Sequence, residues 1–331
     1  MSVRVEEVGD GTEWNELLAG SRGGSPFHRY EFLETCARHG DATVHPYVGY
    51  KGEEPIGLFP VLEARKGPFT AAFSPPPDLK VPYLGPAPLN AGKLKRGKRE
   101  RRNRRFVEAV LDRVDREFGP RFVNVRTSPD YDDERPFVWA GYDATPRYTY
   151  VLDLTENVED LRMALNSGVR KSVRERADGF EIAEADLGDV ERIIEGAARR
   201  HAEKGADYNV TPSFVTDLHD ALPDGMVRAH VCRHDGEFCG GEVSLEYDGT
   251  VYGWQSYGDL SRSVPVYDLM YWHIFRAAKE RGCTAYDLLG ANNPDLCRYK
   301  AKFSPELRKY QALNRATLDM KAAAKVYKRL R

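Results

Sequence analysis

The sequence predicts an α+β fold in two domains, each with a mixed, mostly antiparallel sheet flanked by helices. The chain has 331 residues, which is too many for one comfortable core and enough for two ordinary domains. Helical apolar stripes and short strand-like runs occur in both halves. Asp235-Gly236 and Asp248-Gly249 separate apolar runs, and such dipeptides predict tight hairpins between antiparallel strands. We expect the domain boundary near Pro146.

Composition indicates a globular enzyme. Hydrophobic residues make up 41% of the chain and charged residues 30%, unlike a disordered chain. Apolar runs are far shorter than a membrane span, and the start MSVRVEEVGD carries acids where a secretory signal would be basic and apolar. We therefore expect a cytoplasmic protein. The cysteines are odd in number and scattered, which argues against a disulfide framework; they are Cys36, Cys232, Cys239, Cys283 and Cys297.

The first domain, residues 1–146, is expected to mix strands and helices. A basic run enters a helix whose apolar stripe starts at Phe106 and ends near Gly119. Seven prolines between 67 and 90 exclude regular structure there and predict a long ordered loop or lid. The other expected elements are helices over 12–20 and 28–38, a hairpin over 45–64, a strand over 122–126 and a linker over 128–146.

The second domain, residues 147–331, is more regular. Asn157 suits a helix N-cap, and Pro265 and Gly282 suit the start and end of a later helix. The terminal helix should pack through an apolar stripe that starts at Leu318. The expected strands cover 147–154, 180–185, 226–233, 238–247, 250–257, 284–290 and 307–314, and the expected helices cover 157–173, 187–201, 212–221, 265–282, 295–303 and 318–330.

One segment, the basic arm (residues 93–105), concentrates positive charge. It holds nine basic residues and one acid, whereas the whole chain carries a formal charge of −2. Such an arm on a mildly acidic protein is a candidate for binding a polyanion. It has few aromatic residues to stack on single-stranded RNA, so backbone contacts to folded RNA or to anionic lipid fit better. The candidate contacts are Arg101, Arg102, Arg104 and Arg105.

The element order of the second domain resembles the GNAT acyltransferase fold. Four strings are more specific: DERPFVWAGYDATPRYTYVLDL, GEFCGGEVSL, VPVYDLMYWHIFRAAKERG, and YDLLGANN followed by Tyr299-Lys300-Ala301-Lys302-Phe303. Together they are similar to the Fem family of peptidoglycan-bridge aminoacyltransferases and its CelD-type acetyltransferase relatives. Those proteins carry two GNAT-like domains, and the resemblance covers almost the whole chain. It also implies that the terminal helix reaches back towards the first domain.

The resemblance implies an N-acyltransferase that forms an amide on an amine acceptor, such as that of a cell-envelope precursor. No tightly bound cofactor is expected; the donor is aminoacyl-tRNA or an acyl thioester such as acyl-CoA. Acetyl-CoA users in the superfamily carry a Gln/Arg-x-x-Gly-x-Gly/Ala turn that holds the pyrophosphate. Residues 255–260 and 262–265 match it only in part, and Pro265 removes an N–H. Cys36 stands where Fem proteins tend to have a lysine, so a nucleotide-muramyl acceptor is not supported.

Two residues are candidates for the chemistry. Lys300 and Phe303 match the lysine-x-x-phenylalanine of the family, which implies a lysine that stabilises negative charge at the acyl-transfer centre. Asp259 is a candidate base. A solvated lysine on a short helix and an ordinary loop aspartate are the alternatives. The expected substrate contacts, which lie where the superfamily opens its clefts, are Phe303, Trp254, Gln255, Tyr257 and Arg262.

Two further pairs have a functional and a structural interpretation. Gly240-Gly241 suits a β-bulge that presents backbone N–H groups to the acyl carbonyl, and suits tight packing equally. Arg170 and Arg174 lie four apart on one helix face, where they form either a phosphate-binding ridge or a solvated surface.

A metal site is not expected. Cys232, His234 and Cys239 are close in sequence, but their spacing is not a standard zinc pattern. A Cys239 nucleophile lacks a histidine assigned by spacing. His201, on an apolar helix face, suits a core or cleft histidine better than a catalyst.

The main rival is a non-catalytic module that binds RNA or an anionic membrane through the basic arm. Lys300 and Phe303 argue against it, because a binding module does not need them. Among donors, the basic arm favours aminoacyl-tRNA, and the incomplete turn weakens acyl-CoA.

Overall fold

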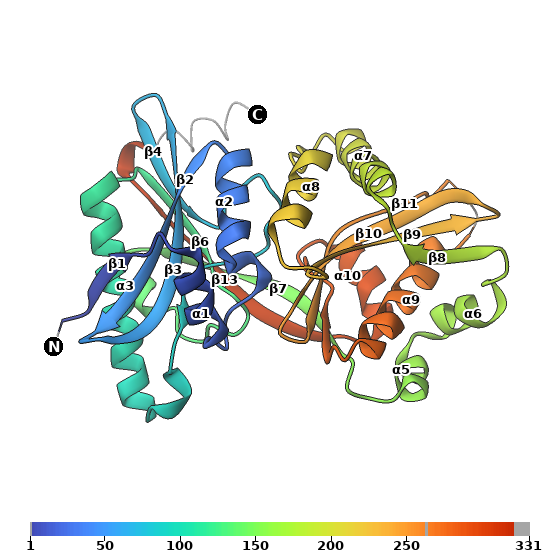
Figure 1. Ribbon diagram of the computed structural model, residues 1–331, viewed down its shortest axis with the longest axis horizontal. Helices are drawn as coiled ribbons and strands as arrows, with labels where there is room; N and C mark the ends of the chain where they lie inside the picture. Colours follow the sequence, from blue (N-terminus) through green and yellow to red (C-terminus); the bar gives the residue numbers. More distant parts are fainter. Residues whose placement is uncertain (1, 262–263, 321–331) are drawn as a thin grey trace. The chain divides into compact units, whose positions relative to one another are not determined.

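The computed structural model describes residues 2–261 and 264–320. The chain divides into two compact units (Figure 1): unit 1 holds the chain up to Arg147 and again from Lys309 onward, and unit 2 holds Tyr148–Arg308. The division falls next to the expected boundary at Pro146, but the end of the chain groups with unit 1 and not with the second domain. The cause is strand pairing, since β13 (Glu306–Ala316) runs antiparallel to β6 (Phe122–Arg126). Of the terminal helix expected over 318–330, all but 318–320 lies outside the described residues.

Unit 1 contains a mixed, mostly antiparallel sheet. Only the pair β4–β6 is parallel among the pairings of its main strands. A short strand, β5 (Ala87–Pro88), adds to β3. In sheet order the strands are β1 (Arg4–Glu7), β2 (Ala42–Lys51), β3 (Glu54–Lys66), β4 (Phe69–Ser74), β6 and β13.

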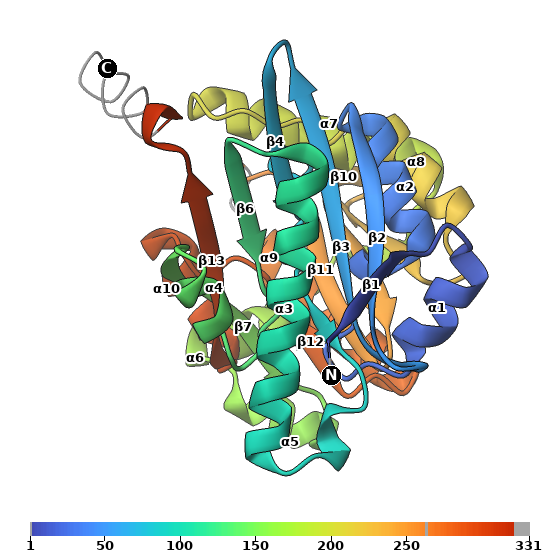
Figure 2. The same cartoon turned by 90° about the vertical axis from the view of Figure 1, so that its left-hand side faces the viewer.

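Helices cover both faces of this sheet. The basic arm leads into α3 (Arg96–Phe118), which lies across one face, while α1 (Gly11–Ala19) and α2 (Tyr30–His39) lie on the other (Figure 2). Phe106 of α3 packs over the β2–β3 hairpin at Gly49 and Gly57, where a Cβ would overlap its ring. These glycines are therefore required for the close approach of helix and sheet.

Two expectations for unit 1 need correction. The proline-rich segment 67–90 holds β4 before its proline run, because Phe69–Ser74 pairs with both β3 and β6. The linker 128–146 holds a short helix, α4 (Arg135–Trp139), which packs Phe137 into the core. Among the described residues, no helix is both long and apolar enough to cross a membrane.

Unit 2 contains the expected meander. The strands β9, β10 and β11 pair antiparallel in sequence, and β11 pairs parallel with β12. The α+β class and the mostly antiparallel sheet are thus confirmed. In sheet order the strands are β7 (Asp143–Asp153), β12 (Ala285–Asp287), β11 (Thr250–Gly258), β10 (Glu237–Tyr247), β9 (Val227–His234) and β8 (Phe180–Glu184).

The helices of unit 2 sandwich its sheet. On one face lie α7 (Leu187–Glu203) and α8 (Pro212–Ala221), and on the other lie α6 and α9 (Figure 1). The helix expected over 157–173 is two helices, because Leu165 and Asn166 are extended and the Asn166 side chain caps the second. The remaining bounds are α5 (Val158–Ala164), α6 (Ser167–Glu175), α9 (Val266–Glu280) and α10 (Pro294–Lys300).

Candidate functional site

The sheet of unit 2 opens between β11 and β12. These strands pair only through Thr250–Tyr252 and Ala285–Asp287, although β11 runs on to Gly258 alongside β10. After Asp287 the chain turns through Leu289 and Gly290, both with positive φ. The Asp287 carboxylate holds this turn by accepting from the Leu289 N–H at 2.9 Å and from the Thr149 hydroxyl. The outer edge of β11 beyond Tyr252 is therefore not covered by β12.

A bulge lies at the same place in β11. Val243 of β10 pairs with Gln255 and Ser244 pairs with Gly253, so Trp254 is the extra residue. The bulge turns both Trp254 and Gln255 towards α8 and the segment that precedes it: the Trp254 ring packs on Phe214, and Tyr208 donates to Gln255 Oε1 at 2.7 Å. A second register shift lies in β10 between Phe238 and Gly240, next to the Gly240-Gly241 pair that the sequence suggested for a bulge.

Gly240 and Gly241 are required by packing. A Cβ on Gly240 would lie 2.6 Å from the Tyr257 carbonyl oxygen, and one on Gly241 would lie 2.6 Å from the His230 carbonyl oxygen and overlap Ile193. Distances below 3.0 Å between a Cβ and backbone require the backbone to shift. Tight packing is therefore enough to explain why glycine stands at both positions.

Lys300 is not a surface lysine. Its ammonium group donates to the carbonyl oxygens of Leu288, at 2.8 Å, and Leu289, in the turn after β12. Burial lowers the pKa of Lys300 to about 8, and the negative charges of Asp287 and Glu242 oppose that shift. The lysine thus closes the turn at the point where the sheet opens.

Glu242, which the sequence interpretation missed, is a buried carboxyl near this lysine. It is 1% exposed on the α9 face of β10. Tyr286 donates to Oε1, and Oε2 has no hydrogen-bond partner among the described residues. Burial raises the pKa of Glu242 to about 7, with hydrogen bonds from Tyr286 and Tyr271 acting in the opposite direction. The sequence held a signal for it, since Glu242 lies between Gly241 and Val243 in the middle of a central strand, where a charged residue is unusual.

Other expected contacts are spread around this opening. The Asp259 N–H donates to the Cys239 carbonyl at 2.8 Å, and its carboxylate accepts from the Ser261 N–H and hydroxyl at 3.0 and 2.6 Å. The Tyr257 hydroxyl accepts from Arg199 at 3.1 Å. Arg262 lies outside the described residues.

Phe303 lies in the core of unit 2. Its side chain is 0% exposed and packs edge-on against Tyr271, Phe275 and Tyr299. The lysine-x-x-phenylalanine pattern therefore combines a lysine at the opening with an aromatic residue that is buried in the core and anchors the short helix.

The arginines of α6 do not form a common ridge. Arg170 donates to the carbonyl oxygens of Met163 and Leu165 at 2.8 and 2.6 Å, which satisfies the end of α5. Arg174 pairs with its neighbour Glu175. The structural interpretation accounts for Arg170, and only Arg174 stands on the exposed surface.

The basic arm begins α3 and is partly neutralised. Arg102 makes a two-pronged ion pair with Glu54, with distances of 3.0 and 3.1 Å. Arg104 pairs with Glu108 at 2.7 Å. Arg101 and Arg105 have exposed side chains on the same helix. Half of the four proposed polyanion contacts thus already face a carboxylate.

Cys232, Cys239 and His234, which are close in sequence, do not share one site. The sulfurs of Cys232 and Cys239 lie 3.3 Å apart in the core, while the His234 ring packs on Phe180. Within the described ranges no group of three or more His, Cys, Asp or Glu side chains is arranged to hold a metal ion.

Comparison with known proteins gives the class. Residues 161–301 match the family described as an acetyltransferase (GNAT) domain. The crystal structure of FemX superposes with a TM-score of 0.70 at 12% identity, covering 93% of this chain and 96% of that one. L-PGS from Bacillus licheniformis gives 0.57 at 14% identity, covering 96% and 95%. A tandem GNAT protein from the clavulanic acid biosynthesis pathway gives 0.53 at 12%, covering 95% and 98%. No curated protein matches the chain in sequence.

The matched domain and the fold around the open sheet define an acyltransferase. Residues 161–301 form a GNAT acetyltransferase domain, and the chain has a fold similar to that of FemX over almost its whole length.

Proposed function

We propose that unit 2 forms an amide by transferring an acyl or aminoacyl group from an activated donor to an amine, and that it does so at the opening between β11 and β12. The observation that carries this proposal is the position of Lys300, whose ammonium group lies at the turn where β12 leaves β11. Attack of an amine on an acyl carbonyl builds negative charge on the carbonyl oxygen, and a nearby fixed cation stabilises it.

The chemistry of Lys300 suits this role. An ammonium group has three N–H donors, and two of them serve the carbonyl oxygens of Leu288 and Leu289. The remaining donor is oriented by these two bonds and is the one we assign to the developing oxyanion. Asp287 holds the same turn, so its role is to position the lysine.

The loop after β11 favours an aminoacyl ester over acyl-CoA as the donor. A pyrophosphate cradle needs several backbone N–H groups that are open to a ligand. Here the Asp259 N–H donates to Cys239, the Ser261 N–H donates to Asp259, and the Val266 N–H donates to Val264. Pro265 has no N–H.

Paired lysine variants test the proposal. The purified chain is first analysed by mass spectrometry for retained nucleic acid and small molecules, and transfer is then measured with aminoacyl-tRNA and with acyl-CoA. Lys300→Ala should raise the activation free energy of transfer by about 2–4 kcal/mol and so lower kcat, with a smaller effect on the affinity for the donor. Lys302→Ala is the matched control, because its ammonium group lies over the Tyr299 ring, 4.9 Å from the ring centre.

Because Lys300 is half-buried, folding is monitored as well. Circular dichroism and thermal melting show whether Lys300→Ala remains folded, and Lys300→Arg restores a cation at the site. Equal kcat for the parent, Lys300→Ala and Lys302→Ala would remove Lys300 from the mechanism. Faster transfer from acyl-CoA than from every aminoacyl-tRNA would overturn the choice of donor.

A further inference from the structure

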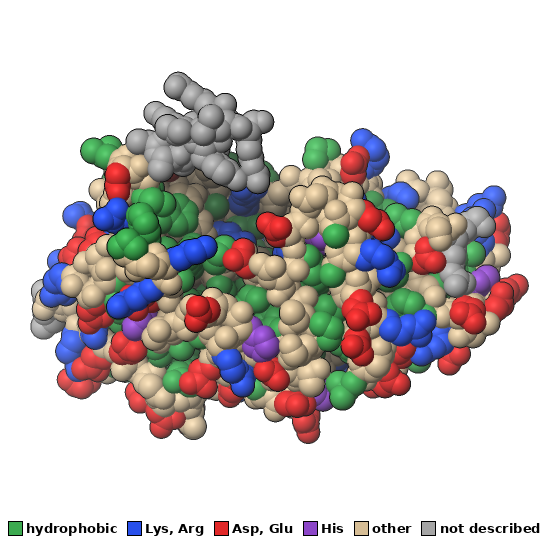
Figure 3. Space-filling view, turned by 90° about the horizontal axis from the view of Figure 1, so that it is seen from above, with side chains coloured by type: hydrophobic (Ala, Val, Ile, Leu, Met, Phe, Trp, Pro, Cys, Tyr) green, Lys and Arg blue, Asp and Glu red, His purple; other side chains and the backbone are tan. Residues whose placement is uncertain are grey.

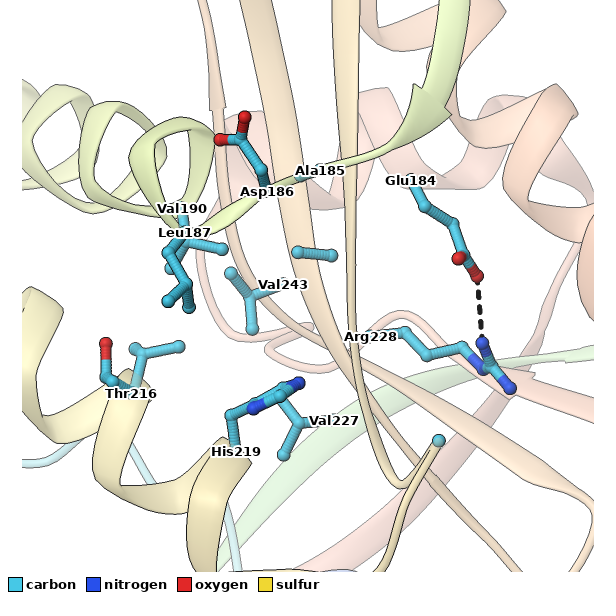
Figure 4. Close-up of a pocket in the computed structure, with 13 residues that line it drawn as sticks. Glu184, Ala185, Asp186, Leu187, Val190, Thr216, His219, Val227, Arg228 and Val243 are labelled. Carbon is cyan, nitrogen blue, oxygen red and sulfur yellow. Dashed lines mark hydrogen bonds and ion pairs between the residues drawn. The ribbon is translucent and has the colours of Figure 1, made fainter.

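Unit 2 contains a cavity of about 420 Å³ that none of the chemistry above uses. It lies on the α7–α8 face of the sheet, on the side opposite α9 (Figure 4). Its walls come from the end of β8, the start of α7, the middle of α8 and the strands β9 and β10. Cavities of this size accommodate small organic ligands.

The inner wall of the cavity is apolar. Figure 4 shows Leu187 and Val190 of α7 on one side of the space and Val227 on another, with Val243 on the sheet. Val190, Val227 and Val243 are buried, whereas Leu187 at the mouth is 59% exposed. An exposed leucine beside a buried apolar wall lets a hydrocarbon group enter from solvent and leave water.

The rim of the cavity carries two carboxylates and one arginine, together with His219, whose ring pairs with Asp220 at 3.3 Å. Glu184 and Asp186 are both exposed there. The one arginine of the lining, Arg228, is engaged by two carboxylates, with Glu184 at 2.9 Å and Glu246 at 2.7 Å. The Asp186 carboxylate also accepts the Asp189 N–H at 2.8 Å as the cap of α7. A cation at the rim is therefore favoured over an anion.

The cavity adjoins the bulged part of the sheet. Val243 lines it, and the register partner of Val243 on β11 is Gln255, next to the bulge at Trp254. Gln255 is 5% exposed, and its Nε2 has no hydrogen-bond partner among the described residues. A ligand in the cavity would thus lie one strand away from β11.

We propose that this cavity is a binding site for an amphiphilic cation, with a hydrocarbon group against the valine wall and an ammonium group at Asp186 on the rim. The site goes beyond the proposed transfer reaction, since its binding chemistry requires no acyl donor. The amine acceptor of that reaction belongs to the same chemical class.

Three six-carbon probes test the site. Binding of hexylamine, hexanol and hexanoate to the full chain is measured by titration calorimetry and by saturation-transfer NMR. Hexylamine should bind most tightly and hexanoate least. Thr216→Phe, which fills the cavity from α8, should lower the affinity for hexylamine about tenfold or more. Ala221→Phe, on the same helix but outside the lining, should not weaken it.

A charge variant separates the rim from the wall. Asp186→Asn keeps a side chain able to cap α7 and removes the charge. The affinity for hexylamine should therefore fall about three- to fivefold, while the affinity for hexanol should not change. Glu191→Gln, on the exposed surface of α7, is the control. Equal binding of the three probes, or hexylamine binding that Thr216→Phe leaves unchanged, would overturn the site. Because no donor is present, this result is independent of whether Lys300→Ala affects transfer.

Discussion

Glu242 is buried and Lys300 is half-buried, and the pKa values of these two groups are shifted towards each other. Burial raises the pKa of Glu242 to about 7 and lowers the pKa of Lys300 to about 8. Each charge lessens the cost of the other, so both groups are charged together mainly between these values. Sites where two groups titrate near neutrality are typical of proton transfer and charge stabilisation. We therefore interpret the Glu242–Lys300 pair beside the sheet opening as part of the site of charge stabilisation.

Glu242→Gln should change how stability depends on pH. A carboxyl whose pKa is raised by folding stabilises the native state below its unfolded pKa, near 4.5, and loses that contribution as pH rises through about 7. The free energy of unfolding of the parent relative to Glu242→Gln should therefore fall by about 2–3 kcal/mol between pH 4.5 and 8. Urea denaturation at several pH values measures it. A difference that does not vary with pH would show that Glu242 has an ordinary pKa.

The same variant should move the pH profile of transfer. The Glu242 charge raises the pKa of Lys300, so its removal lowers that pKa further below about 8. If protonated Lys300 stabilises the oxyanion, the alkaline fall in kcat should begin at lower pH in Glu242→Gln than in the parent. Glu191→Gln, on the exposed surface of α7, serves as the control and should keep the parent profile. An unshifted alkaline limb would separate Glu242 from Lys300.

At the scale of elements, the sequence predicted correctly those turns whose shape depends only on their own residues. Asp235, Gly236, Asp248 and Gly249 all have positive φ, which aspartate tolerates and glycine favours, and they form the predicted hairpin turns. In contrast, β4 was not predicted, because the seven prolines of 67–90 argued against regular structure, whereas Phe69–Ser74 lies before the proline run and pairs with β3 and with β6, which follows about fifty residues later. The helix expected over 157–173 is divided by two extended residues, Leu165 and Asn166. The spacing of apolar residues does not show such a break.

The packing of α7 on β10 gives a prediction at this scale. Gly241→Ala should lower the free energy of unfolding by about 1–3 kcal/mol, because the added methyl group meets Ile193 of α7 and the His230 backbone. Gly97→Ala is the matched control: nothing lies within 4 Å of its Cβ in α3, and alanine should raise stability by about 0.5–1 kcal/mol. Chemical denaturation measures both. Equal effects of the two substitutions would contradict the close approach of α7 to β10.

For the whole chain, the sequence predicted fold and class better than the site. Lys300 was singled out because its motif is local, but its partial burial depends on carbonyl groups of the turn after β12. Glu242 was missed, since only the assembled sheet and α9 surround it. The sequence around the basic arm also does not show which of its charges are paired: Glu54, which pairs with Arg102, lies 48 residues away in sequence. On the face in Figure 3, acidic and basic side chains are interspersed and do not form a large area of one sign.

This pairing alters what the basic arm should contribute to binding a polyanion. Each arginine that contacts a phosphate adds slightly less than one to the slope of log affinity against log salt. Arg101 is exposed, so Arg101→Ala should reduce the slope for tRNA by about 0.7–0.9 if the arm binds it. Arg102 has a side chain only 12% exposed and would have to leave Glu54 first, so Arg102→Ala should change the slope far less. Filter binding at several salt concentrations measures both slopes. Equal reductions would mean that the Arg102–Glu54 pair opens on RNA, and two unchanged slopes would assign α3 a structural role and leave the proposed aminoacyl-tRNA donor to be held elsewhere.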